Sequence, residues 1–309
     1  MRHPAPRLAA LPAVLAAASV LVSGCSTADD PASPLGRDRV IQVVAAENFW
    51  GSIASQVGGD HVHVQSIITS PNTDPHSYEP TSVDARAIAG ARFVIENGIG
   101  YDPWMGRLIA ADQMSQGVLD VGSVLGVPPG GNPHRWYNPA DVLTVVRWMA
   151  ADFARIDPAD RAYFAGRQAL FDSVALREYH ALIAMIRARY AGTPVGASES
   201  IFAMLALALG LRLITPPSFL KAISEGTEVS VADKLTIDHQ IRQHLIKIFI
   251  YNSQNVTPDV QAQLSEARAA HISVATITET LVPPTVSFQA WQVRQLRGIA
   301  AALARATGR

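Results

Sequence analysis

Residues 157–191 read DPADRAYFAGRQALFDSVALREYHALIAMIRARYA, and this stretch decides the fold. Asp157 is a suitable helix cap, and Pro158 suits the first helical position. Apolar side chains then recur at helical spacing as far as Tyr190. An unbroken helix over 157–191, despite Gly166, would be about 50 Å long. Few single domains contain a helix of this length, so we expect it to join two lobes. We also expect it to be rigid.

Alternating strands and helices are predicted on both sides of this helix. Val40 to Ala46 is a nearly continuous β-branched run, typical of a strand buried on both faces. Further strands are predicted at 61–68, 92–95, 194–197, 247–251 and 272–277, with helices between them. This alternation predicts an α/β fold with two parallel-sheet lobes, 39–156 and 192–309. Ligands bind beyond the carboxyl ends of such strands, so the cleft between the lobes is the expected site.

Composition excludes several classes of protein. The chain has 309 residues, 49% of them hydrophobic, which is enough for a sizeable core and too apolar for general disorder. A formal charge of −1 leaves no large basic surface for a nucleic acid, so we expect no nucleic-acid partner. We also expect the protein to be a monomer. The single cysteine, Cys25, rules out an internal disulfide framework and a CxxC site.

The first residues are typical of an export signal. Arg2 and Arg7 precede a mostly apolar run over 8–22, which is too short to span a membrane. Val-Ser-Gly-Cys at 22–25 resembles a bacterial lipobox, in which the cysteine is acylated. We therefore predict a lipoprotein signal peptide at 1–24, an acyl anchor on Cys25 and a flexible tether over 25–38. The body would then be extracytoplasmic and held to the bilayer.

Two loops share one pattern of chemistry-bearing residues. Asp74-Pro-His-Ser-Tyr-Glu-Pro80 and Asn132-Pro-His-Arg-Trp136 each place a histidine after Asp/Asn-Pro, with an aromatic residue two positions later. Because proline restricts the backbone on either side of it, His76 and His134 are expected to be held firmly. The repetition favours a shared binding role over two unrelated surface histidines.

These loops resemble the zinc/manganese family of solute-binding lipoproteins that serve ABC importers, also called cluster A-I. The same resemblance extends to Asn97-Gly-Ile-Gly100, Asp157-Pro158 and Ser198-Glu-Ser-Ile-Phe202, and so covers nearly the whole body. It implies a receptor, not an enzyme, that captures a divalent transition metal between its lobes and delivers it to a membrane permease.

The resemblance also implies the metal ligands. His76, His134 and Glu199 occupy three ligand positions of the family. The fourth is usually Asp, and here Glu279 stands in the corresponding turn, where it either binds directly or lies one shell away. Tyr78 and Asn252 are candidates for hydrogen bonds to the ligands, Asn252 because it lies where many relatives have a Glu-Pro-Gln sequence.

The chemistry of this donor set leaves the metal open. Two neutral imidazoles and two carboxylates neutralise a dication, and mixed nitrogen and oxygen donors suit Mn²⁺, Fe²⁺ or Zn²⁺. Glu at the third position resembles the manganese-type relatives, yet Zn²⁺ accepts carboxylates equally well.

A hydrolase is the alternative. Gly196-Ala-Ser198-Glu-Ser200 approaches a nucleophile elbow with Ser198 at the bend, but the fifth residue is not glycine and no H-G-G-G loop precedes it. A metallohydrolase on the same four ligands would need an open water position and a base. The serine enzyme would leave both Pro-His loops without a role.

Overall fold

The computed structural model describes Met1, residues 40–113 and residues 117–309. Apart from Met1, the predicted signal peptide (1–24), Cys25 and the tether (25–38) lie outside the described residues. Among the helices that are described, none combines the length and the apolar character needed to cross a membrane.

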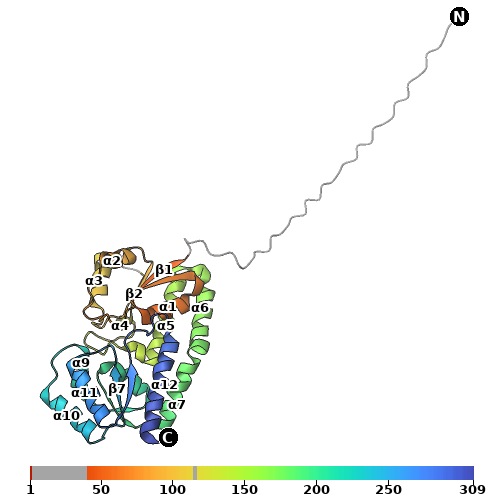
Figure 1. The fold of residues 1–309 in the computed structure, drawn as a ribbon. Coiled ribbons are helices and arrows are strands. Elements are labelled where there is room, and N and C mark those ends of the chain that lie inside the picture. Colours follow the sequence, from red (N-terminus) through yellow and green to blue (C-terminus); the bar gives the residue numbers. More distant parts are fainter. Residues whose placement is uncertain (2–39, 114–116) are drawn as a thin grey trace. The chain divides into compact units, whose positions relative to one another are not determined.

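Two four-stranded parallel sheets with the same strand order form the body (Figure 1). The first has the order β2-β1-β3-β4, and the second has the order β6-β5-β7-β8. In the first sheet Val43 lies opposite Val64 on one side and Phe93 on the other. The strands are β1 (Ile41–Glu47), β2 (Val62–Ile68), β3 (Phe93–Glu96), β4 (Val118–Asp120), β5 (Pro194–Ala197), β6 (Arg212–Leu213), β7 (Ile248–Asn252) and β8 (Ser273–Ile277). The predicted fold of two parallel-sheet α/β lobes is confirmed.

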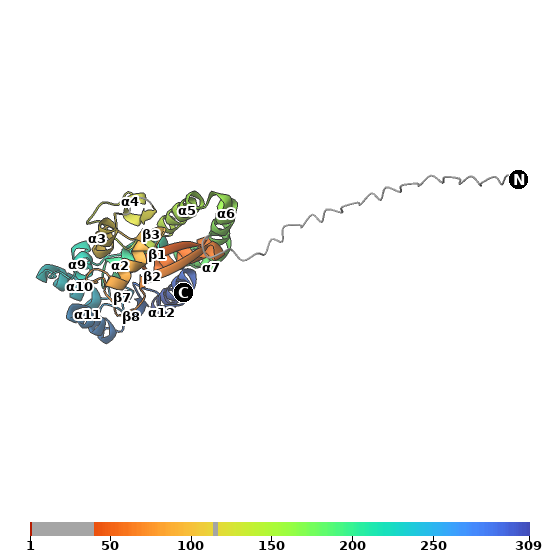
Figure 2. The same cartoon turned by 90° about the horizontal axis from the view of Figure 1, so that it is seen from above.

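Helices cover both faces of each sheet. Figure 2 shows the first sheet between α2 and α3 on one side and α5 on the other. The first lobe contains α1 (Asn48–Gly58), α2 (Ser82–Ala89), α3 (Pro103–Ala111), α4 (Val121–Val124) and α5 (Pro139–Ile156). The second contains α8 (Ala203–Leu209), α9 (Pro217–Ser224), α10 (Val231–Arg242), α11 (Pro258–Ala269) and α12 (Phe288–Thr307).

The helical path between the lobes differs from the expected single α-helix. It consists of a 3-10 turn (Pro158–Asp160), α6 (Arg161–Leu170), a π-helical segment (Phe171–Ala175) and α7 (Arg177–Tyr190). The Leu176 N–H donates to the Phe171 carbonyl over 3.0 Å, five residues back. This wider turn lets Phe171 and Leu176 both enter the core, whereas Leu170 and Val174, two other apolar residues of the predicted helix, are exposed.

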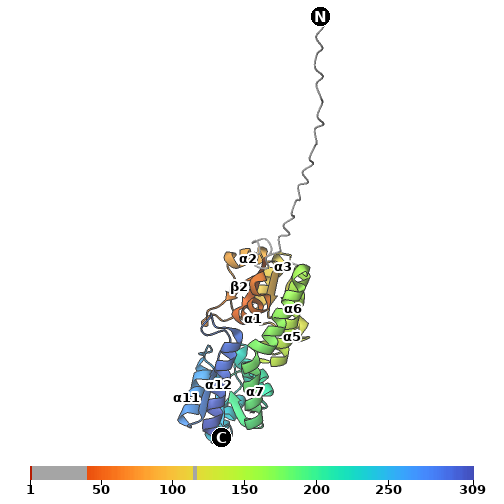
Figure 3. The same ribbon diagram turned by 90° about the vertical axis from the view of Figure 1, so that its right-hand side faces the viewer.

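One hydrophobic cluster runs through both lobes, and we call it the shared core. Its members include Val43 and Phe49 of the first lobe, Ile250 of the second, and Tyr179 of α7. Helix α12 packs beside α7 and closes this core (Figure 1 and Figure 3). Separate clusters fill the outer faces, under α2 and α3 in the first lobe and under α9, α10 and α11 in the second. The lobes are therefore joined by packing as well as by the chain.

Candidate metal centre

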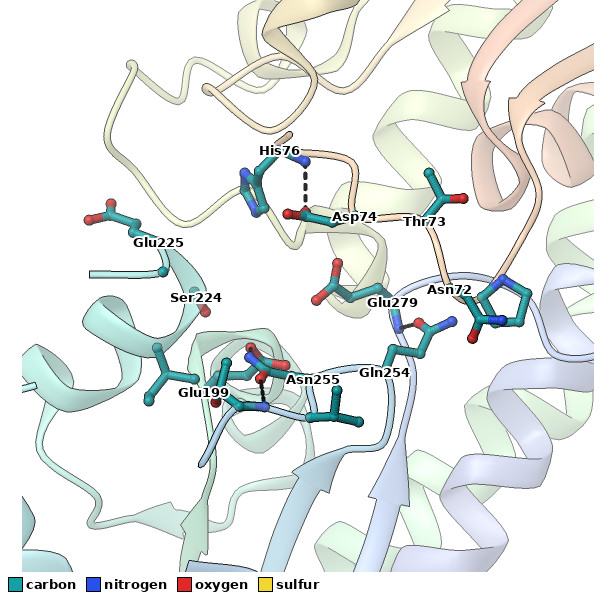
Figure 4. Close-up of a pocket in the computed structure, with 15 residues that line it drawn as sticks. Asn72, Thr73, Asp74, His76, Glu199, Ser224, Glu225, Gln254, Asn255 and Glu279 are labelled. Carbon is teal, nitrogen blue, oxygen red and sulfur yellow. Dashed lines mark hydrogen bonds between the residues drawn. The ribbon is translucent and has the colours of Figure 1, made fainter. Parts of the chain in front are cut away.

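Loops at the carboxyl ends of the strands meet in a pocket of about 390 Å³ (Figure 4). His76 comes from the loop after β2, Glu199 follows β5, and Glu279 follows β8. All three line this pocket, together with Asp74 and Glu225. His134 does not line this pocket and is buried, 1% exposed. The repeated strand order thus brings the predicted ligands to one region, as expected for parallel sheets.

The first Pro-His loop holds His76 through the side chain of Asp74. Asp74 Oδ1 accepts the backbone N–H of His76 at 2.9 Å, and Oδ2 accepts the Ser77 hydroxyl at 2.8 Å. The Pro75 carbonyl accepts the indole N–H of Trp104 at 3.2 Å. These bonds fix the turn while the imidazole of His76 faces the pocket.

The second loop repeats this turn and also fixes the imidazole of His134. Asn132 Oδ1 accepts the backbone N–H of His134 at 3.0 Å and faces His134 Nδ1 at 2.9 Å. Asn132 Nδ2 donates to the Ser200 carbonyl at 2.8 Å, which fixes the orientation of the amide. His134 Nδ1 must then carry the proton, and Nε2 keeps its lone pair. Burial, with the charge of His76, lowers the pKa of His134 to about 3, so the ring is neutral at physiological pH.

Glu199 brings a buried carboxylate with a free oxygen. Its backbone is extended after β5, and its side chain is 1% exposed. Oε2 accepts the side-chain N–H of Asn255 at 3.1 Å, whereas Oε1 has no hydrogen-bond partner in the described part of the chain. Burial raises the pKa of Glu199 to about 7. A buried acceptor without a donor is costly, and a cation is a suitable partner for it.

Glu279 is held on three sides. Its Oε1 accepts the side-chain N–H of Asn252 at 2.8 Å, and its Oε2 accepts the Tyr101 hydroxyl at 3.0 Å. Its backbone N–H donates to Gln254 Oε1 at 2.6 Å. Burial and the charge of Glu199 raise the pKa of Glu279 to about 7. The two carboxylates therefore repel each other unless a proton or a cation lies between them.

The two candidates for hydrogen bonds to the ligands have different positions. Asn252, at the end of β7, bonds directly to Glu279. Tyr78 does not line the pocket: its hydroxyl donates to Asp84 Oδ2 at 2.9 Å, and its ring packs on Trp104. Asp84 also forms the capping box at the start of α2, so Tyr78 belongs to that helix end.

Sequence reasoning missed Tyr101, a fully buried residue in the middle of the ligand set. Its ring meets those of His76 and His134 edge to face, with centroids 4.8 and 5.9 Å away. Asp102 accepts the backbone N–H groups of Asn97 and Gly98 at 2.7 and 2.8 Å, which tightens the turn before Tyr101. An aromatic residue directly after the Asn-Gly-Ile-Gly turn was the available signal.

Ser198 has surroundings unlike those of a nucleophile. It is 1% exposed, and its Oγ accepts the Asn252 backbone N–H at 3.1 Å. No histidine hydrogen-bonds to it within the ranges that the structure describes. The geometry therefore gives the serine hydrolase alternative no support.

The predicted ligands are near one another without being drawn together around one point. In residues 40–113 and 117–309, no three His, Cys, Asp or Glu side chains are close enough to hold one metal ion. The donor set itself fits a transition metal: a neutral imidazole with a free Nε2, a second imidazole on the pocket wall, and two buried carboxylates. Binding by all four would require them to approach one another.

The chain is similar to several known metal-binding proteins. The chain is 25% identical over 150 residues to the manganese-binding lipoprotein MntA of Halalkalibacterium halodurans, covering 47% of this chain and 49% of that relative. It is 26% identical over 291 residues to the iron-binding protein YfeA of Yersinia pestis, covering 89% and 86%. The match thus spans about half the length of the first relative and most of the second.

The fold also has solved counterparts. The periplasmic zinc-binding protein TroA from Treponema pallidum superposes with a TM-score of 0.70 at 17% identity, over 86% of this chain and 99% of that one. The family model ZnuA, described as "Zinc-uptake complex component A periplasmic", matches residues 43–302. As the paired Pro-His loops and the motifs that follow them predicted, the chain belongs to this family of metal solute-binding proteins.

Proposed function

We propose that this protein is an extracytoplasmic receptor that binds one divalent transition metal ion between its lobes and delivers it to the permease of an ABC importer. The observation that carries this proposal is the gathering of His76, His134, Glu199 and Glu279 at the carboxyl ends of two parallel sheets. Two neutral imidazoles and two carboxylates balance the charge of a dication in a low-dielectric cleft.

These four residues are the proposed ligands, with Asn132 and Asn252 as their hydrogen-bond partners. Metal is the cargo, and the names of the relatives mention manganese, iron and zinc. The donor set accepts Mn²⁺, Fe²⁺ or Zn²⁺, and affinity alone rises from manganese towards zinc, so selectivity depends on geometry and supply.

The test is elemental analysis of the protein purified without added metal, followed by competitive titration of Mn²⁺, Fe²⁺ and Zn²⁺. We expect one metal ion per chain and submicromolar binding of at least one of the three. A protein that retains no metal and binds none of the three tightly would overturn the proposal.

Binding without catalysis is part of this proposal. We expect no labelling by fluorophosphonates, no hydrolysis of simple esters, and no hydrolysis of these esters after metal loading. Ser198 supports this expectation because its hydroxyl is buried and bonded to the backbone of Asn252. Turnover that disappears in Ser198→Ala would restore the serine hydrolase, and turnover that requires the loaded metal would restore the metallohydrolase.

Lipid attachment at Cys25 completes the proposed function. The apolar run 8–22 and the small residues before Cys25 support it. Metabolic labelling with a fatty acid should mark the wild-type chain and leave Cys25→Ala unmarked. An unlabelled wild-type chain that leaves the membrane at high salt would contradict the anchor. By size-exclusion chromatography with light scattering we expect a monomer.

A further inference from the structure

Tyr101 connects the two lobes at the centre of the proposed site. It follows β3 in the first lobe, and its hydroxyl donates to Oε2 of Glu279, which follows β8 in the second lobe, at 3.0 Å. Its ring is fully buried and lies edge to face with His76 and His134. It therefore borders three of the four proposed ligands, and it hydrogen-bonds to one of them.

The turn that carries Glu279 is also attached to the first lobe at both of its ends. Tyr137 donates its hydroxyl to the Thr278 carbonyl at 2.7 Å. Asn48 Oδ1 accepts the backbone N–H of Leu281 at 3.1 Å. The hydrogen bond from Tyr101 adds the side chain of Glu279 to these two contacts with the first lobe. The second lobe holds the same residue through Asn252 and Gln254, so Glu279 is held from both lobes.

Glu199 provides the contrast. Its hydrogen-bond partner is Asn255, which follows β7 in the same lobe as Glu199 itself. Its other oxygen has no partner in the described residues. The two carboxylates thus differ: Glu279 is held from both lobes, and Glu199 from one.

We propose that Tyr101 is a positioning residue that raises metal affinity by fixing the orientation of the Glu279 carboxylate on the pocket wall. This inference rests on the proposed function, because it takes Glu279 as a ligand. A glutamate has three rotatable side-chain bonds, and holding it before metal arrives reduces the entropy lost on binding. Each carboxylate oxygen has two lone pairs, so Oε2 can accept the phenol and still face a metal ion.

The decisive experiment is a pair of double-mutant cycles with Zn²⁺ as the probe, measured by competition with a chromogenic chelator. Tyr101→Phe removes one oxygen and keeps the ring that packs on the histidines. We expect it to weaken Zn²⁺ binding by about 10–100-fold in the wild-type background. In the Glu279→Ala background we expect no further loss, because the carboxylate that Tyr101 positions is gone.

Glu199→Ala is the matched control background. Tyr101 does not hydrogen-bond to Glu199, so Tyr101→Phe should still weaken binding by about 10–100-fold there. Equal losses in the Glu279→Ala and Glu199→Ala backgrounds would show a general structural effect and overturn the inference. Wild-type affinity in Tyr101→Phe would overturn it as well. A wild-type protein that binds no Zn²⁺, Mn²⁺ or Fe²⁺ tightly would instead contradict the proposed function itself.

Circular dichroism of each metal-free variant will show whether it folds. A second variant keeps the inference testable if the first one does not. If Tyr101→Phe does not fold, Asn252→Ala removes the other donor to Glu279. Asn252 also lies beside Glu199, so this comparison uses Glu279→Ala alone, where the loss of Zn²⁺ affinity should vanish. An equal loss in the wild-type and Glu279→Ala backgrounds would overturn the positioning of Glu279 by its hydrogen-bond donors.

Discussion

Asn132 Oδ1 accepts two hydrogen bonds from His134, one from the backbone N–H at 3.0 Å and one from Nδ1 of the imidazole at 2.9 Å. One amide oxygen therefore sets the turn and the tautomer together, and leaves Nε2 as the coordinating atom. Asn132→Ala should weaken metal binding by about 10–100-fold, because the imidazole loses its fixed tautomer and orientation. Asn72→Ala, a change of the same type on the wall of the pocket that His76 and Glu279 line, is the control and should titrate like the wild type. Equal effects of the two changes would contradict this role.

Removal of either histidine should abolish tight binding. His76→Ala and His134→Ala each delete a proposed nitrogen ligand, and isothermal titration with Zn²⁺ or Mn²⁺ should then show no high-affinity phase. His63→Ala changes an exposed histidine of β2 and should leave the titration as it is. An unchanged titration in His76→Ala or His134→Ala would refute the proposed ligand set.

Metal affinity should fall as the pH drops below about 7. Glu199 and Glu279 both have a pKa raised to about 7, chiefly by burial, and each must lose its proton to bind a cation. Competition titrations between pH 5.5 and 8 should therefore show weaker binding at the acid end, with protons released as the metal binds. Glu225→Gln, an exposed change at the pocket, should keep this profile. Constant affinity over the range would contradict buried carboxylate ligands.

The metal-free protein should lose stability as the pH rises from 6.5 to 8. In the folded chain Glu199 and Glu279 titrate near 7 and Glu96 near 8, all raised mainly by burial, whereas the usual value is 4.5. The folded state therefore binds more protons than the unfolded state in this window, and the free energy of unfolding decreases with pH. The lowered pKa of His134 acts in the opposite direction, but only below 6.5.

Urea denaturation of the metal-free protein at several pH values measures this slope. Glu96→Gln should reduce it, since this change removes one of the three groups that titrate there. Stability that stays constant or rises between pH 6.5 and 8 in the absence of metal would contradict the raised pKa values of these carboxyls.

Metal loading should move the lobes only slightly. The shared core crosses from one sheet to the other, and a wide rotation would expose residues such as Phe49 and Ile250 to water. Scattering curves or structures with and without metal should differ by a rotation of about ten degrees or less. A rotation of tens of degrees would show that the shared core separates.

Much of the fold follows from local patterns. The β-branched run in β1, the apolar run in β7 and the helical spacing in α12 are strong signals, and the structure has elements there. The sequence reading gave no bounds for α2, although Thr81 and Asp84 form a capping box whose pattern is visible in the chain. It also missed β6, a strand of two residues that exists only through its pairing with β5. Such short strands have no periodicity of their own.

The candidate site was less accessible to sequence reasoning than the fold. The paired loops identified His76 and His134, because their Asp/Asn-Pro-His pattern is local. Tyr101 and Glu279 are 178 positions apart, and their hydrogen bond depends on how the two lobes pack. The same holds for Asn255 and Glu199, which come together only when β5 and β7 pair. Relationships of this kind require the tertiary structure.

The shared core also determines how the chain can be divided. A fragment ending near Gly192 would leave Phe171, Tyr179 and Tyr190 without their neighbours from the second half, and a fragment starting there would lack the packing that α7 gives to α12. Each half would expose a broad apolar face and tend to aggregate. Each half, although it has the same strand order as the other, therefore needs the other half to stay soluble. We expect the two halves to unfold together in a single thermal transition.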